Sequence, residues 1–337
     1  MPKIINTILS IIVLLFVSSA IAEVEREMNM NKQINKAPIM FATFAESEEQ
    51  VEHVFILAES IRQFGGAVKD APIYLYIGDY SDVDIEKAEE RLRDLNVTVQ
   101  SSSAPKEALW FYYAGKVYAS AVAEKEAEKQ ASVLVWMDDD TIFLDEPSEL
   151  LLPTDISFGY RPVMHNRSGT LYGTEPGPFW SRIYELLNVD YNKLFPMTTP
   201  ADNQKIYAYF NAGLLVVRPE AGVLRAWVKD FEKLYKDSVL AGMCQENVEH
   251  RIFLHQTALV GAAMNKLKQN EMTELSDKYN YPLFFEQMFG AVHEFGSIEG
   301  ITTLRYDIYF RNPDPDWAEK LKGSSEKVEW LKKYLNR

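Results

Sequence analysis

Strand-length apolar runs alternate with segments of helical periodicity along the first half of the chain, and this alternation limits the possible folds more than any other feature. The predicted strands are 37–44, 71–79, 96–100 and 133–137. The predicted helices are 47–65, 84–95 and 107–129. Ser47 followed by Gln50 is a capping box that starts the first helix, and Gly65 and Gly66 end it. Because strands connected through helices pair in parallel, we predict an α/β fold with a mostly parallel central sheet flanked by helices.

The second half of the chain has less regular patterning. Its predicted strands are 155–160 and 212–219, and its predicted helices are 220–235, 250–267 and a closing helix from about residue 316. In the helix predicted at 107–129, Trp110, Tyr113 and Val117 share one face, which predicts helix packing rather than a platform for a sugar. The 337 residues are 47% hydrophobic, which is enough apolar side chain for one large domain.

The first 22 residues have the features of an export signal. Lys3 precedes an apolar stretch, and Ala20-Ile21-Ala22 is a small-residue pattern before a charged segment. The alternative is an uncleaved anchor, because the stretch is nearly long enough to span a bilayer. Residues 23–36 are polar and are interpreted as a linker. Both readings predict an extracytoplasmic body, which is exported or, in a eukaryotic source, lies in the lumen of the secretory pathway or Golgi. A membrane contact is expected only if this segment stays uncleaved as an anchor.

The charge balance excludes one class of partner. The formal net charge is -14, and the sequence has no run rich in Lys or Arg. A nucleic-acid partner is therefore not predicted. An acidic protein can still bind a phosphorylated substrate when a metal ion supplies the positive charge.

Three consecutive aspartates follow the apolar strand at 133–137. Residues two apart in an extended segment point to the same side, so Asp138 and Asp140 can converge on one hard cation while Asp139 points away. Oxygen ligands favour Mg²⁺ or Mn²⁺ over softer metals. The alternative is a solvated turn that caps the following loop. In a parallel sheet, ligands bind outside the carboxyl ends of the strands, which is where this cluster is predicted to lie.

Two segments resemble sugar-nucleotide-dependent glycosyltransferases of the GT-A fold, particularly the family 8-like group. The segments are "VLVWMDDDTIFLDEPSEL" and "YFNAGLLVVRPE", and the resemblance extends weakly from Pro38 to about Arg311. It implies that Asp138 and Asp140 hold the Mn²⁺ or Mg²⁺ of a metal–nucleotide-sugar complex, with Asp139 among the donor-binding residues. It also implies a nucleotide-sugar-binding half at 37–150 and an acceptor half with a C-terminal helix at 151–337.

The resemblance assigns further residues to the site. Asn211, Ala212 and Gly213 line the sugar pocket, with Asn211 counted as catalytic; the alternative is a turn that only enters a core strand. Gln256 matches the second residue of the family's Asp-Gln pair and is also counted as catalytic, although His255 stands in place of the acid.

Further positions complete the resemblance. Ala42, Thr43 and Phe44 are expected against the nucleotide base. Lys116 matches a basic residue that reaches the donor; the alternative is a solvated charge on the helix face. His293 is the expected third metal ligand, although the lysine and tryptophan that follow it in family 8 are absent here.

These assignments predict a metal-dependent glycosyltransferase. It moves a sugar from a nucleoside diphosphate sugar, with UDP favoured, to a hydroxyl of a glycan, protein or lipid, and the family 8 likeness favours retention of anomeric configuration. The alternative is a catalytically inactive exported domain of the same fold that binds carbohydrate or protein. A glycoside hydrolase is disfavoured, because no pair of carboxylates is placed to flank one bond.

Overall fold

The computed structural model describes residues 36–283, 297–306, 319 and 321–335, and residues Pro38–Arg337 belong to one compact unit. Some predicted features lie outside the described residues. They are the signal segment at 1–22, residues 23–35 of the linker, and His293. None of the helices within the described ranges combines the length and the apolar character needed to cross a membrane.

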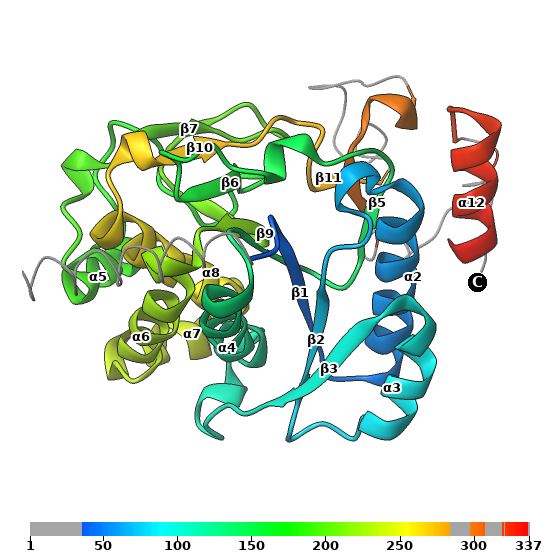
Figure 1. Ribbon diagram of the computed structural model, residues 1–337. Coiled ribbons are helices and arrows are strands. Elements are labelled where there is room, and N and C mark those ends of the chain that lie inside the picture. Colours follow the sequence, from blue (N-terminus) through cyan, green and yellow to red (C-terminus); the bar gives the residue numbers. More distant parts are fainter. Residues whose placement is uncertain (1–35, 284–296, 307–318, 320, 336–337) are drawn as a thin grey trace, which may run out of the picture. The chain divides into compact units, whose positions relative to one another are not determined.

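A seven-stranded sheet with the order β10-β6-β9-β4-β1-β2-β3 forms the centre of the unit (Figure 1). Its strands are β1 (Met40–Ala45), β2 (Ile73–Gly78), β3 (Val97–Ser102), β4 (Leu134–Met137), β6 (Phe158–Pro162), β9 (Phe210–Val217) and β10 (Met272–Glu274). Strand β9 is antiparallel to both neighbours, and the other pairings are parallel. The predicted α/β architecture with a mostly parallel sheet is therefore confirmed.

Helices cover both faces of this sheet. The helices among the described residues are α2 (Glu48–Phe64), α3 (Ile85–Leu92), α4 (Ala114–Gln130), α5 (Pro178–Leu187), α6 (Val223–Tyr235), α7 (Ser238–Glu246), α8 (Val248–Lys266) and α12 (Ser325–Leu335). Helices α2 and α3 lie on one face, and α4, α6 and α8 lie on the other (Figure 1). All six residues of β1 are buried, which explains why the sequence there is continuously apolar instead of alternating.

Two smaller sheets and several short turns make up the rest of the described secondary structure. Strands β11 (Tyr281–Pro282), β12 (Thr303–Arg305) and β5 (Thr141–Phe143) form one sheet, and β7 (Pro196–Thr198) pairs with β8 (Lys205–Tyr207). The 3-10 turns are η1 (Gly66–Val68), η2 (Arg93–Leu95), η3 (Ala108–Trp110), η4 (Ser148–Leu150), η5 (Tyr191–Lys193), η6 (Pro219–Ala221), η7 (Gln269–Glu271) and η8 (Ile298–Gly300). Strand β5 directly follows Asp140, so its pairing with β12 holds the backbone in place on the C-terminal side of the aspartate cluster.

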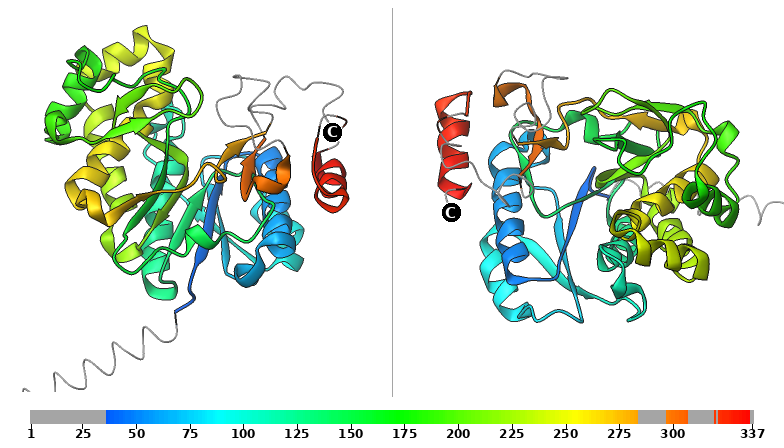
Figure 2. Two further views of the ribbon diagram at one scale, coloured as in Figure 1. Left: turned by 90° about the horizontal axis from the view of Figure 1, so that it is seen from above. Right: turned by 180° about the vertical axis from the view of Figure 1, so that it is seen from behind.

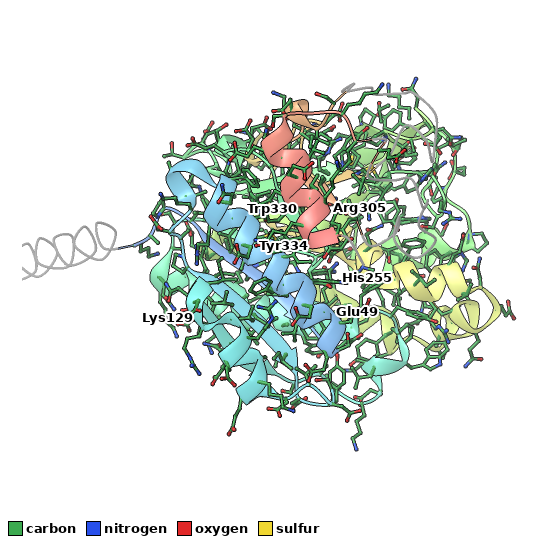
Figure 3. All side chains as sticks on the ribbon, turned by 90° about the vertical axis from the view of Figure 1, so that its right-hand side faces the viewer. Glu49, Lys129, His255, Arg305, Trp330 and Tyr334 are labelled. Carbon is green, nitrogen blue, oxygen red and sulfur yellow. The ribbon has the colours of Figure 1, made fainter. Side chains whose placement is uncertain are left out.

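The first helix begins as its capping residues predict. The backbone N–H of Gln50 donates to Oγ of Ser47 (3.3 Å), and Oε1 of Gln50 accepts from the backbone N–H of Glu46 (2.8 Å). The closing helix α12 packs beside α2 (Figure 2). The rings of Trp330 and Tyr334, labelled in Figure 3, contact Phe64 and Phe55 of α2 at 5.5 and 6.3 Å between centroids.

The start of the third helix differs from the prediction. Helix α4 begins at Ala114 and not at residue 107, because Tyr113 adopts a left-handed conformation with φ of 61° and the preceding residues form η3. Trp110 and Tyr113 consequently lie outside the helix and are 42% and 45% exposed. The packing stripe expected from Trp110, Tyr113 and Val117 is therefore wrong, and of the three only Val117 belongs to the core.

Candidate functional site

The aspartate cluster and the Phe-Asn-Ala-Gly segment meet where β4 and β9 pair. The backbone N–H of Asp138 donates to the carbonyl oxygen of Gly213 at 2.9 Å. A Cβ at position 213 would lie 2.9 Å from Oδ2 of Asp138 and 2.9 Å from Oδ1 of Asn211. Glycine is thus needed there for both side chains to lie this close to the backbone, and the structure brings together three residues that sequence patterns placed in one site.

Asp138 forms an ion pair with Lys116. Lys116 comes from the first turn of α4, and its Nζ contacts Oδ1 of Asp138. The lysine side chain is 8% exposed and the aspartate side chain 30% exposed, so the pair lies at the boundary between core and solvent. A partly buried lysine opposite a carboxylate provides a fixed positive charge at the end of the sheet.

Asp139 is turned away from Asp138 and toward α2. Its Oδ2 lies 2.7 Å from Nδ1 of His53, and its Oδ1 accepts from Nε2 of Gln50 at 3.4 Å. Burial raises the pKa of the Asp139 carboxyl, and the hydrogen bond with His53 acts in the opposite direction. Asp139 therefore anchors the cluster to α2, and its assignment as a donor-binding residue stays a prediction.

Asp140 completes the cluster and is 7% exposed. Its carbonyl oxygen accepts from the backbone N–H of Tyr306 at 3.3 Å. With Asp139 and Asp140 mostly buried, the solvated turn that stood as the alternative does not describe this segment.

The amide of Asn211 is held by its own strand and by Asn280. Its Oδ1 accepts from the backbone N–H of Gly213 (2.7 Å) and from Nδ2 of Asn280 (3.2 Å). Asn280 is 1% exposed and left-handed with φ of 53°, and its N–H donates to Oγ1 of Thr303 at 2.8 Å. The Oδ1 atom of Asn211 is thus occupied, which leaves its NH₂ group as the part that could bind a hydroxyl.

Gln256 supports the same strand from α8. Its Oε1 accepts from the backbone N–H of Ala212 at 3.1 Å, and its side chain is 8% exposed. Ala212 itself is 1% exposed. The structure therefore places Gln256 behind the Asn-Ala-Gly segment, and its catalytic assignment stays a prediction.

His255 lies beside Lys116 and carries no charge at neutral pH. Its Nδ1 is 2.8 Å from the carbonyl oxygen of Ile252, and its ring lies 4.8 Å from that of Tyr113. Burial and the nearby positive charge of Lys116 lower the pKa of His255 to about 3. The resemblance expects an acid at position 255, but a neutral imidazole occupies it. The carboxylate that pairs with Lys116 is therefore that of Asp138.

Acid is expected to weaken the fold through His255. Between pH 6.5 and about 3, the unfolded chain binds a proton that the folded chain does not, so the free energy of unfolding falls as the pH falls. At pH 5 the loss is about 2 kcal/mol, and His255→Gln should remove it. Urea unfolding of both proteins at pH 7 and pH 5 measures the difference; equal losses in the two proteins would contradict the assignment.

Ala42 and Thr43 of β1 are both fully buried, and Oγ1 of Thr43 has no hydrogen-bond partner in the part of the chain that the structure describes. Their contact with a nucleotide base stays a prediction. Next to them, Phe44 and Tyr80 lie close to Gly115 of α4, where a Cβ would come within 2.6 Å of Phe44 Cζ.

The donor chemistry of the cluster suits a hard divalent cation, although the described residues do not form a complete set of ligands. Asp138 keeps its Oδ2 directed toward Gly213 and Asn211 while Oδ1 contacts Lys116. Across the described ranges, no three His, Cys, Asp or Glu side chains gather closely enough to hold a metal. His293, the expected third ligand, lies outside those ranges.

Several of these contacts were not anticipated from the sequence. His53 and Asn280 each bind a motif residue that is distant in the chain, and neither has a pattern that reveals its partner. Gln50 was recognised as a capping residue and not as a partner of Asp139. The one signal in the sequence was His53 on a largely apolar face of the first helix. A buried imidazole needs a hydrogen-bond partner, so this position predicts a polar contact but not its identity.

Comparison with known proteins identifies the class of enzyme to which this chain belongs. A model described as the Rhodobacterales glycosyltransferase domain matches residues 42–266, more than half of the 337 residues. Together with the fold and the adjoining motifs, this match identifies a glycosyltransferase and confirms the predicted GT-A resemblance. The chain belongs to the family of Rhodobacterales glycosyltransferase domains. No curated protein matches it.

Similar solved structures are also glycosyltransferases. The galactosyltransferase LgtC in complex with donor and acceptor sugar analogs is 13% identical, with 88% of this chain and 95% of that chain covered and a TM-score of 0.45. The bifunctional WbbM is 13% identical, with 88% and 51% covered and a TM-score of 0.48. Mouse xyloside xylosyltransferase 1 is 12% identical, with 83% and 99% covered and a TM-score of 0.44.

Proposed function

We propose that this glycosyltransferase uses a nucleoside diphosphate sugar, with UDP as the favoured nucleotide, and a divalent cation, Mn²⁺ or Mg²⁺. The acceptor is a hydroxyl of a glycan, protein or lipid, and the anomeric configuration is retained. The observation that carries this proposal is the junction of β4 and β9, where Asp138, Asn211 and Gly213 meet beside the ammonium group of Lys116.

Each residue has a separate task in this proposal. Asp138 and Asp140, with His293 as the third ligand, hold the ion, which when bound stabilises negative charge on the departing diphosphate. Lys116 supplies a second positive charge at the same end of the sheet. The NH₂ group of Asn211 and the open backbone at Gly213 contact sugar hydroxyls.

The transfer then requires no separate base from the protein. The acceptor oxygen forms a bond to the anomeric carbon, the bond from that carbon to the diphosphate oxygen breaks, and the diphosphate leaves with the electron pair and takes the acceptor proton. No carboxylate in the described part of the site is clearly placed to act as a base, which supports this route.

Export of the body is a further part of the proposal. Residues 1–22 act as a cleaved signal or as an anchor, and the protein works in an extracytoplasmic or lumenal space. The second candidate function, an inactive carbohydrate- or protein-binding domain, is favoured by the neutral His255 in the acid position.

Release of nucleotide from donor sugars tests which candidate is correct. We expect the purified protein to release UDP, with water taking the place of the acceptor hydroxyl, from at least one of UDP-glucose, UDP-galactose, UDP-xylose and UDP-N-acetylglucosamine when Mn²⁺ is present. A coupled assay for free UDP detects the release, with protein in EDTA as the control. Absence of release from every donor, in protein shown to be folded, would favour the inactive binding domain.

A methyl group at position 213 should disturb the site. In Gly213→Ala the new Cβ must displace both Asp138 Oδ2 and Asn211 Oδ1, each at 2.9 Å, so we expect the affinity for UDP with Mn²⁺ to fall about tenfold. Gly242→Ala in α7 is the matched control, because nothing lies within 4 Å of its Cβ. Calorimetric titration with UDP measures both variants; equal affinities would show that the ligand does not use this junction.

A further inference from the structure

Three of the four consecutive aromatic residues just before α4 are exposed instead of buried. Trp110 is 42% exposed, and Tyr112 and Tyr113 are each 45% exposed. Phe111, between them, is buried and contacts Phe231 of α6 at 6.1 Å between ring centroids. The segment is thus anchored by one ring while its neighbours face solvent, which is an unfavourable arrangement for large apolar rings unless something else covers them.

Arg251 of α8 fixes two of these rings in place. Its guanidinium carbon lies 4.9 Å from the ring centroid of Trp110 and 4.8 Å from that of Tyr112. Its Nη2 also donates to the hydroxyl of Tyr112 at 3.0 Å. We name Trp110, Tyr112, Tyr113 and Arg251 the aromatic rim. Cation–π contacts of this kind give the rim a defined shape before any ligand arrives.

The aromatic rim adjoins the donor site. The ring of Tyr113 lies 4.8 Å from that of His255, and Nζ of Lys116 lies 5.5 Å from the Tyr113 centroid. Lys116 in turn pairs with Asp138. A chain of direct contacts therefore connects the exposed rings with the end of the sheet where the donor sugar is proposed to bind.

The rim is distinct from the place expected for the nucleobase. The base is expected against β1, where Phe44 and Tyr80 lie next to Gly115 of α4. Tyr113 instead contacts α8 through His255, and Trp110 and Tyr112 contact α8 through Arg251. The expected base site therefore lies between α4 and β1, whereas the aromatic rim lies against α8. The rim can thus bind a second substrate while the nucleobase occupies its own place.

We propose that the aromatic rim is an acceptor subsite that binds a pyranose ring, so that the acceptor of the proposed function is a glycan. An aromatic face carries negative charge from its π electrons and attracts the C–H groups on the flat side of a sugar ring. Arg251 offers guanidinium donors to the sugar hydroxyls, since one of its five N–H groups is used by Tyr112. A serine side chain or a simple lipid alcohol has no flat face that would use three rings.

Saturation-transfer NMR with simple sugars tests the subsite without requiring turnover. The probes are the methyl β-glycosides of glucose, galactose and mannose, together with lactose, cellobiose and maltose; sorbitol is the acyclic control. We expect transfer to the ring C–H protons of at least one cyclic probe and none to sorbitol. Trp110→Ala/Tyr112→Ala should weaken that binding about tenfold, and Trp110→Phe/Tyr112→Phe should recover most of it.

Two results would overturn the subsite: binding of no cyclic probe to the wild-type protein, or equal binding to the wild type and the double alanine variant. Val239→Ala, at a 49% exposed position of α7, controls for general surface effects. Calorimetry with UDP and Mn²⁺ on the same samples separates the two proposals. Sugar binding at the rim without metal-dependent nucleotide binding would retain the sugar site and remove the proposed transferase function.

Discussion

Asp138→Asn should abolish most of the donor turnover of this protein while keeping its fold. The substitution is nearly isosteric, yet it removes the negative charge that faces Lys116, Asn211 and Gly213 at the end of β4. If Asp138 holds the ion that stabilises the diphosphate, the rate of UDP release should fall by about 10³.

The control for this experiment is Asp145→Asn, an exposed carboxylate after β5 whose Oδ1 accepts from the adjacent backbone N–H of Glu146 at 2.8 Å. It should keep the wild-type rate. Circular dichroism of each variant checks the fold. If Asp138→Asn retained more than about a tenth of the wild-type rate, the ion would not be held by this residue.

Glu124→Ala should be strongly destabilising although it lies away from the site. Glu124 of α4 is fully buried, and its carboxylate accepts from the backbone N–H groups of Leu224 (3.0 Å) and Arg225 (2.9 Å) at the start of α6. It also pairs with Nε of Arg225 at 2.9 Å. Alanine would leave these donors without a partner and open a cavity, so we expect a loss of about 3–5 kcal/mol in the free energy of unfolding.

Glu128→Ala offers a matched comparison on the same helix. Glu128 pairs with the same arginine, but its side chain is 43% exposed, so its removal should cost no more than about 1 kcal/mol. Urea unfolding measures both variants. Equal losses would show that burial of Glu124 does not determine its contribution.

The fold could be predicted from the sequence to the extent that it depends on local periodicity. The strands and helices up to β4 follow patterns of apolar residues that are visible within ten to twenty positions, and Leu224, Trp227 and Phe231 of α6 are buried as their spacing predicts. Helices α5 and α7 were not anticipated. Helix α7 begins directly after Lys236 and Asp237, so its sequence reads as a continuation of the preceding amphipathic segment.

The start of α4 shows where local patterns fail. Trp110, Tyr113 and Val117 have helical spacing, but Tyr113 is left-handed, which is uncommon for an aromatic residue and has no sequence signature. The contact of Tyr113 with His255 links segments far apart in the chain. Such long-range contacts decide the local conformation, so the exposed rings could be found only from the structure.

The site was predictable in its motifs and not in its supporting contacts. Asp138, Asn211 and Gly213 were placed in one site because their two motifs resemble those of GT-A glycosyltransferases, and the structure brings them together. His53 and Asn280 were missed, because each acts through a side chain that bonds to a residue distant in the sequence.

Calorimetric titration with UDP and with GDP, with and without Mn²⁺, tests the central claim most directly. We expect the wild-type protein to bind a nucleoside diphosphate only when the metal is present, and Asp138→Ala/Asp140→Ala to lose that binding while remaining folded. Binding to neither nucleotide, or binding by the double variant equal to that of the wild type, would contradict a metal-assisted donor site at the end of β4.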